Sequence, residues 1–142
     1  MNRPSHRASR VALALIACLA LLLLGAASAS AARCHGKHAT IVGTPGNDVL
    51  VGKGANDVIY GGGGDDKIYG GRNGNDTICG GPGNDRIYGG KGFDKLYGEG
   101  GNDRAKGGSG SDRVEGGSGD DQLSGEKGKD NLLGGGGDDT LL

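Results

Sequence analysis

One aliphatic residue recurs about every nine positions from Gly43 to Leu142, with polar and glycine-rich sequence between these residues. The stretch divides into eleven units, ten of nine residues and one, Gly70 to Cys79, of ten. We number the places of a unit one to nine, so that glycine opens each unit and the aliphatic residue stands at place eight. The place-eight residues are Leu50, Ile59, Ile68, Ile78, Ile87, Leu96, Ala105, Val114, Leu123, Leu132 and Leu141. A short fixed period is typical of solenoids, in which each unit stacks on its neighbours.

Places one to six predict a turn, because glycine adopts positive φ without steric cost and Asn or Asp tolerates it next best. Places seven to nine have room for a short strand, with place eight on one side and places seven and nine on the other. Such a strand needs neighbours stacked at about 4.8 Å. Two units then form one flattened coil, and the aliphatic residues meet between two sheets. The fold class that we expect is all-β, a two-sheet parallel β-roll of eleven nonapeptide repeats.

Place six is an aspartate in every unit: Asp48, Asp57, Asp66, Asp76, Asp85, Asp94, Asp103, Asp112, Asp121, Asp130 and Asp139. Stacking brings the carboxylates of units two apart close together, and like charges in one column repel. Carboxylates and the bare carbonyls of glycine-rich turns are the hard oxygen ligands that Ca²⁺ selects, so a bound Ca²⁺ relieves this repulsion. The alternative is that each aspartate caps its own turn without a metal.

The hydrophobic core that this pattern predicts is thin. Burying one aliphatic side chain contributes about 2 kcal/mol. Each unit orders nine residues for that gain, and fixing one backbone costs about 1–2 kcal/mol, most of all for glycine. We therefore expect ion binding to supply part of the folding free energy.

The units resemble the nonapeptide of the RTX, or haemolysin-type, calcium-binding repeat family over residues 43–142. The resemblance implies a right-handed β-roll in which each Ca²⁺ lies between the turns of units n and n+2. Place-six side chains and turn carbonyls would be the ligands. Eleven units leave at most nine such gaps, and those beside the ten-residue unit and the unit with Ala55 in place of glycine are the weakest candidates. The toxins and proteases of this family are similar to the chain only in their C-terminal arrays, so neither activity is expected here.

Composition narrows the class of protein further. Gly is 34 of 142 residues, but the period is nine rather than three and only 3 residues are Pro, which argues against collagen. A flexible linker would not place an aspartate and an aliphatic residue at fixed offsets. The formal net charge is −1, and without the three arginines of residues 1–32 it becomes −4. With this mildly acidic net charge, neither nucleic acid nor an anionic membrane is an electrostatically favoured partner.

Residues 1–32 are typical of a secretory signal peptide. They contain three arginines before Val11, then a Leu/Ala run, and small residues at the end of the segment. Cleavage fits after Ala29, Ala31 or Ala32. An uncleaved anchor is the alternative, but the apolar run is shorter than the roughly 20 residues that span a bilayer. A second alternative is lipidation of Cys18. We expect a secreted, extracellular protein with no membrane span after cleavage.

Residues 33–42 are expected to form a leading strand, or cap, before the array at 43–142. Export permits a disulfide between Cys34 and Cys79. A straight continuation of the coil separates the two, so the bridge requires residues 33–39 to fold back; free thiols or an intermolecular bridge are the alternatives. Cys34, His35 and His38 also form a weak candidate Cu²⁺ or Zn²⁺ site. The alternative is that these residues belong to a solvated tail and bind no metal.

Place nine is expected to carry short tyrosine ladders, with Tyr69 over Tyr88 on one face and Tyr60 and Tyr97 flanking Cys79 on the other. Ordinary cross-strand packing explains them, and a contact surface for an envelope or extracellular partner is the alternative. No catalytic set can be assembled from the sequence, and an ice-binding ladder would need more Thr. We expect a non-enzymatic Ca²⁺-binding protein; the second hypothesis is a Ca²⁺-stiffened adhesion or cell-envelope interaction module.

Overall fold

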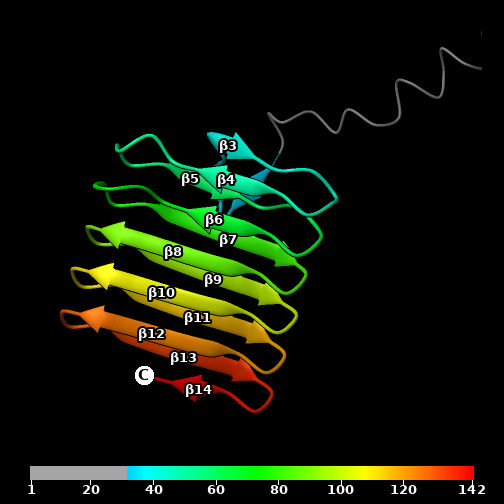
Figure 1. The fold of residues 1–142 in the computed structure, drawn as a ribbon, viewed down its shortest axis with the longest axis vertical. Helices are drawn as coiled ribbons and strands as arrows, with labels where there is room; N and C mark the ends of the chain where they lie inside the picture. The colour runs from blue at the N-terminus through cyan, green and yellow to red at the C-terminus, as the bar shows by residue number, and fades with distance from the viewer. Residues whose placement is uncertain (1–31) are drawn as a thin grey trace, which may run out of the picture. The chain divides into compact units, whose positions relative to one another are not determined.

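The structure is a computed structural model that describes residues 32–142 (Figure 1). These residues form strands and turns without a helix. The strands are β1 (Arg33–Cys34), β2 (Lys37–His38), β3 (Ile41–Val42), β4 (Val49–Val51), β5 (Val58–Tyr60), β6 (Lys67–Tyr69), β7 (Thr77–Pro82), β8 (Arg86–Lys91), β9 (Lys95–Gly100), β10 (Arg104–Ser109), β11 (Arg113–Ser118), β12 (Gln122–Lys127), β13 (Asn131–Gly136) and β14 (Thr140–Leu141).

Strands β3 to β14 alternate between two six-stranded parallel sheets (Figure 1). The even sheet has the order β14-β12-β10-β8-β6-β4, and the odd sheet the order β13-β11-β9-β7-β5-β3. Each strand pairs with the strand two units away in register, as Ile68 does with Ile87. The predicted parallel β-roll is confirmed, with two units to a coil.

The strands are longer than the sequence indicated. Strands β4 to β6 have three residues each, as expected, but β7 to β13 have six and continue into places one to three of the next unit. Pairing there skips place one and resumes at place two, as with Gly81 opposite Glu99. The extra ladder adds backbone hydrogen bonds to a roll with few apolar contacts.

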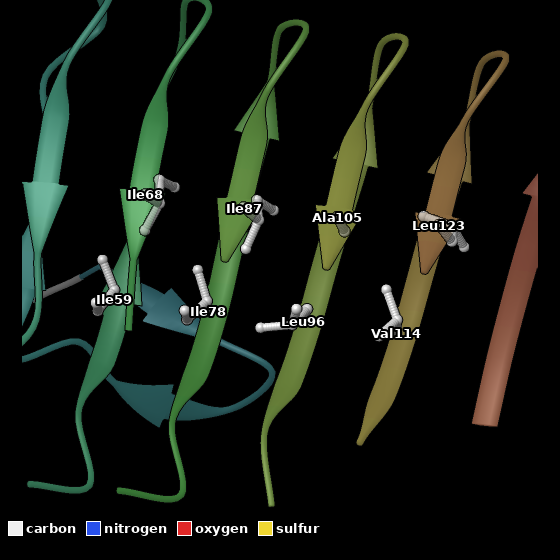
Figure 2. Close-up of a cluster of buried hydrophobic side chains, with 8 residues drawn as sticks. All are labelled: Ile59, Ile68, Ile78, Ile87, Leu96, Ala105, Val114 and Leu123. Carbon is white, nitrogen blue, oxygen red and sulfur yellow. The ribbon is translucent and has the colours of Figure 1, made fainter. Parts of the chain in front are cut away.

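The core is a double row of place-eight side chains between the sheets (Figure 2). Its buried members are Ile59, Ile68, Ile78, Ile87, Leu96, Ala105, Val114 and Leu123, all of them at most 1% exposed. Ile41, Leu50 and Leu132 pack against the two ends of the row. Place eight is therefore the inward position from Ile59 to Leu123, as the alternation predicted, whereas Leu141 in the last unit is 48% exposed.

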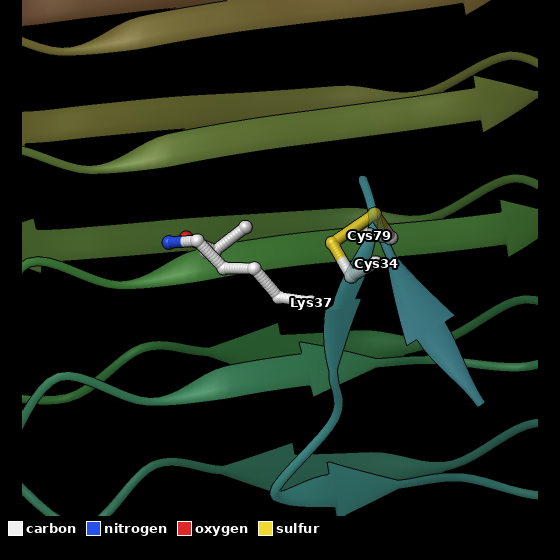
Figure 3. Close-up of a disulfide and its surroundings, with 4 residues drawn as sticks. Cys34, Lys37 and Cys79 are labelled. Atoms are coloured by element: carbon white, nitrogen blue, oxygen red, sulfur yellow. A yellow bond between two sulfur atoms is a disulfide. The ribbon is translucent and has the colours of Figure 1, made fainter. Parts of the chain in front are cut away.

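Residues before the array fold back, as the disulfide requires. Strands β1 and β2 form an antiparallel hairpin against the odd sheet, and Cys34 is bonded to Cys79 of β7, with 5.6 Å between their Cα atoms (Figure 3). The Lys37 Nζ donates to the Thr77 hydroxyl at 3.0 Å. The chain then enters the odd sheet at β3, which pairs with β5.

The predicted signal peptide lies outside the described residues, apart from Ala32. Within residues 32–142, no helix is long and apolar enough to cross a membrane.

Candidate metal centre

The place-six aspartates form two columns, one along each edge of the roll where the turns stack. Those of the even-sheet edge directly precede even-sheet strands and are Asp48, Asp66, Asp85, Asp103, Asp121 and Asp139. Those of the odd-sheet edge are Asp57, Asp76, Asp94, Asp112 and Asp130. Eight of the eleven, from Asp57 to Asp121, are at most 8% exposed, and the other three are half-buried. The structure thus brings all the predicted ligands into two carboxylate columns that are buried along most of their length.

In every carboxylate after the first of its column, one oxygen accepts a hydrogen bond that links it to the preceding aspartate. The backbone N–H of Asp85 donates to the Oδ1 of Asp103 at 2.7 Å, and the N–H of Asp103 donates to the Oδ1 of Asp121 at 2.8 Å. The same bond recurs nine times, five along the even-sheet edge and four along the odd-sheet edge. Each bond spans one gap between units two apart, so the nine gaps inferred from the sequence all exist.

The second oxygen is left without a partner along the middle of both columns. The Oδ2 atoms of Asp66, Asp85, Asp94, Asp103, Asp112 and Asp121 are buried and accept no hydrogen bond. An ionised oxygen in that state is costly, because burial removes its water and nothing replaces it. Six such atoms in one small protein are an arrangement that a cation would complete.

Glycine at places one and four makes room for this arrangement. A Cβ on Gly98, at place one, would lie 2.2 Å from the Asp103 Oδ2. At place four, Gly101 has φ +118°, and a Cβ there would lie 2.1 Å from the carbonyl oxygen of Gly83 in the turn beneath. The turns therefore bring backbone carbonyl oxygens and carboxylates close together, in a space that any side chain would fill.

Burial makes these carboxyl groups unusually weak acids. It raises the pKa of Asp85 and of Asp94 to about 6 and that of Asp103 to about 7, from 3.8. The backbone N–H bond lowers each pKa in part, and neighbouring carboxylates raise it again. Burial likewise raises the pKa of Asp66, Asp76, Asp112 and Asp121. The folded chain thus binds either protons or another cation more readily than free aspartate does.

The first two units differ from the rest. The Oδ2 of Asp48 accepts the Thr44 N–H at 2.6 Å and the Thr44 hydroxyl at 2.9 Å, and the Oδ2 of Asp57 accepts the Lys53 N–H at 2.7 Å. These two aspartates cap their own turns, which is the metal-free alternative considered for the whole set. The structure therefore favours that interpretation at Asp48 and Asp57 and gives the six orphaned carboxylates a different environment.

The side chains at place five form a hydrogen-bonded ladder, where the repeat pattern predicted only a turn. Along the even-sheet edge the side chain at place five accepts the place-five N–H two units on, through every turn from Asn47 to Asp138. Along the odd-sheet edge this ladder ends at Phe93, which has no acceptor, and Ser111 and Lys129 follow. The signal was present in the sequence, because the exceptions to Asn or Asp at place five all belong to alternate units.

An open groove of about 590 Å³ follows the even-sheet edge and is lined by residues at places five to seven of the units between Asn84 and Thr140. Asp85, Asp103 and Asp121 line it together with Arg86 and Arg104. The two edges are therefore not equivalent, and the even-sheet edge offers the greater density of side-chain oxygens.

A different cluster lies under the hairpin. Within residues 32–142, the one group of three His, Cys, Asp or Glu ligand atoms lying within 4.8 Å of one another is His35, Cys79 and Glu99. The ring of His35 also stacks on Tyr97, with 3.4 Å between ring centroids. Because Cys34 and Cys79 are bonded to each other, the predicted Cu²⁺ or Zn²⁺ site of Cys34, His35 and His38 has no free thiolate. The cluster under the hairpin loses its thiolate for the same reason and keeps the His35 imidazole and the Glu99 carboxylate. The place-six aspartates form no such cluster, so an ion there must take further oxygens from the turn carbonyls.

Comparison with known proteins points to the same chemistry as the columns. A family model described as the RTX calcium-binding nonapeptide repeat matches four times, over residues 42–78, 71–105, 80–114 and 106–141. No curated protein and no solved structure gives a significant match. The matches together cover more than two thirds of the chain, and they coincide with the units that carry the aspartate columns and the glycine-lined turns. The chain belongs to the RTX calcium-binding nonapeptide repeat family.

Proposed function

We propose that the protein is a secreted Ca²⁺-binding repeat protein whose β-roll folds when Ca²⁺ binds to place-six carboxylates and turn carbonyls. The six buried, unpartnered Oδ2 atoms carry this proposal. Without a cation each is an unsatisfied buried charge, and a thin core offers little to offset it. With Ca²⁺ present, the same atoms become ligands and the binding free energy adds to folding.

The number of ions follows from the gaps. Nine gaps carry the N–H to Oδ1 bond, so nine ions are the upper limit. We place the tightest sites along the even-sheet edge, because its place-five ladder is unbroken and includes the extra carboxylates of Asp65, Asp120 and Asp138. The weakest lie beside Asp48 and Asp57, whose second oxygen already accepts a backbone N–H.

Export is part of the proposal. The leader within residues 1–32 directs secretion, and the Cys34–Cys79 disulfide suits an oxidising compartment. The Ala32 carbonyl accepts the Ala39 N–H at 3.1 Å, so we place cleavage after Ala29 or Ala31 rather than after Ala32. The chain would remain unfolded where Ca²⁺ is scarce and fold where it is abundant. We assign it no enzymatic role.

A circular-dichroism titration of the processed chain tests the coupling. We expect a coil spectrum in chelator and a strand spectrum on addition of Ca²⁺, with Mg²⁺ far less effective because it demands a small octahedral site. A strand spectrum already complete in chelator contradicts the proposal.

The second candidate function is a Ca²⁺-stiffened adhesion or cell-envelope interaction module. One observation favours it: the hairpin lies against the odd sheet, whereas Tyr69 and Tyr88 stack on the outer side of the even sheet, with ring centroids 5.0 Å apart. Tyr69 is 38% exposed. Retention of the chain on isolated cell envelopes with Ca²⁺, and its release in chelator, would support this role; equal retention in both would count against it.

A further inference from the structure

Charge is unevenly divided between the two sheets. The strands of the even sheet contain six basic residues and one acidic residue, whereas those of the odd sheet contain two of each. On the even sheet, Lys67, Arg86, Arg104 and Lys106 are all exposed. Glu126, the one acid, pairs with Lys106 at 3.3 Å. A chain that is acidic on average therefore carries a strongly basic face.

Three of these cations stand in one column. Lys67 lies opposite Arg86, and Arg86 opposite Arg104, on neighbouring strands about 4.8 Å apart. Like charges directly opposite one another on a sheet are destabilising. Among residues 32–142, none of the three forms a salt bridge, although Arg113 at the same place on the odd sheet pairs with Glu115. The column thus presents a row of cations that form no salt bridge within the described residues.

The tyrosine ladder runs beside this column. Tyr69 and Tyr88 stack with their rings 8° from parallel, so one face of each ring is covered by the other. Val51 and Lys106 stand at the same place on the two strands that flank the pair. The ladder therefore offers hydroxyl groups and ring edges to a partner, and no platform on which a base can stack.

We propose that this face, built from Lys67, Tyr69, Arg86, Tyr88, Arg104 and Lys106, binds an acidic polysaccharide that runs along the stack of strands. Guanidinium groups bind carboxylates through paired hydrogen bonds, and a row of cations along the stack suits a linear polymer with regularly repeated carboxylates. Tyrosine hydroxyls and edges suit a polymer rich in hydroxyl groups.

A groove lies at one end of this face. The groove, of about 340 Å³, extends the face over β10 and β12 and is lined by the polar side chains of Arg86, Tyr88, Arg104, Lys106, Gln122 and Ser124 and by the apolar Ala105 and Leu142. None of the lining side chains is acidic. The face thus continues over several strands without a carboxylate in its lining.

This inference rests on the proposed function, because Ca²⁺ builds the sheet and neutralises the aspartates that precede Arg86 and Arg104. The test therefore keeps the chain in saturating Ca²⁺, and circular dichroism confirms that each variant is folded. Hyaluronate is the probe, since it carries regularly spaced carboxylates; neutral dextran and single-stranded DNA are the comparison polymers. Affinity is measured by electrophoresis through gels that contain each polymer.

Two double variants separate this face from net charge. Arg86→Ser with Arg104→Ser removes two cations from the even sheet. Lys95→Ser with Arg113→Ser makes the same change of charge at the same place on the odd sheet, where both side chains are exposed. We expect the first variant to bind hyaluronate about tenfold more weakly or worse, and the second to bind within about twofold of the parent chain.

Each outcome of this experiment either supports or overturns the proposal. Selective loss in the even-sheet variant, with no retardation by dextran, supports the proposal. Equal loss in both variants, stronger binding to DNA than to hyaluronate, or no binding by a chain that is folded in Ca²⁺ overturns it and leaves the proposed function intact. A chain whose strand spectrum does not depend on Ca²⁺ and which still binds hyaluronate through this face overturns the proposed function instead.

Discussion

Asp103→Asn removes one charge from the centre of the even-sheet column while keeping the shape of the side chain. Asp103 is 1% exposed, and its Oδ2 is one of the six orphaned oxygens. The amide oxygen of asparagine can still accept the Asp85 N–H, so the column itself should survive. What the variant loses is a carboxylate facing the two gaps on either side of it.

The expected size of the effect follows from those two gaps. Asp103 joins Asp85 on one side at 2.7 Å and Asp121 on the other at 2.8 Å. At a free Ca²⁺ concentration about a hundredfold above its dissociation constant, one ion contributes about 2.7 kcal/mol. Loss of two ions therefore removes about 5 kcal/mol, comparable with the whole stability of a small domain, about 5–15 kcal/mol. The Ca²⁺ concentration at the folding midpoint should rise substantially.

Folding is followed by far-ultraviolet circular dichroism against free Ca²⁺, and bound ions are counted by native mass spectrometry. Asp120→Asn is the matched control, because it makes the same chemical change at an exposed place-five side chain whose oxygen accepts the Asp138 N–H. The control should shift the midpoint less and lose fewer ions. If Asp103→Asn binds as many ions as the parent chain at the same midpoint, the aspartate columns are not the calcium ligands.

Three further predictions follow from the same geometry. Burial raises the pKa of Asp103 in the folded chain to about 7, so the Ca²⁺-free roll, populated with an osmolyte, should gain stability as pH falls from about 8 toward 5. Over the same range protons compete with Ca²⁺, so the Ca²⁺ concentration at the folding midpoint should rise. Denaturation and Ca²⁺ titrations at several pH values check the two directions. Gly101→Ala should destabilise the Ca²⁺-bound roll by about 2 kcal/mol or more, since its Cβ would meet a carbonyl oxygen at 2.1 Å, whereas Gly136→Ala, with nothing within 4 Å, should cost less than about 1 kcal/mol in urea unfolding. Cys34→Ser should lower the unfolding free energy in Ca²⁺ by about 2–4 kcal/mol, because the Cys34–Cys79 bridge closes a loop with a sequence separation of 45; an unchanged urea midpoint would show that the hairpin is held by its other contacts.

The repeat made the fold predictable. A place-eight aliphatic residue and a place-six aspartate in every unit were enough to assign Ile68 and Ile87 to the core and Asp85 and Asp103 to one column. The structure confirms both assignments, as well as the stack of Tyr69 on Tyr88. These features depend on periodicity alone, which a single sequence displays fully.

Features that depend on three-dimensional placement were less accessible. The six-residue strands arise because paired glycines continue the ladder of backbone hydrogen bonds. From the sequence, a glycine-rich stretch predicts a turn. The fold-back of residues 33–39 could be stated only as a condition for the Cys34–Cys79 bridge, which the structure satisfies. The average charge hid the basic face, because Arg86 and Arg104 alternate along the chain with residues that lie on the opposite sheet.

The central claim is that Ca²⁺ supplies the free energy that the thin core lacks. Native mass spectrometry of the processed chain at increasing Ca²⁺ tests it most directly, because ion count and compactness are read from the same molecules. We predict two populations, an extended one with few or no ions and a compact one approaching nine, with little between them. A compact species that carries no Ca²⁺ would contradict the account.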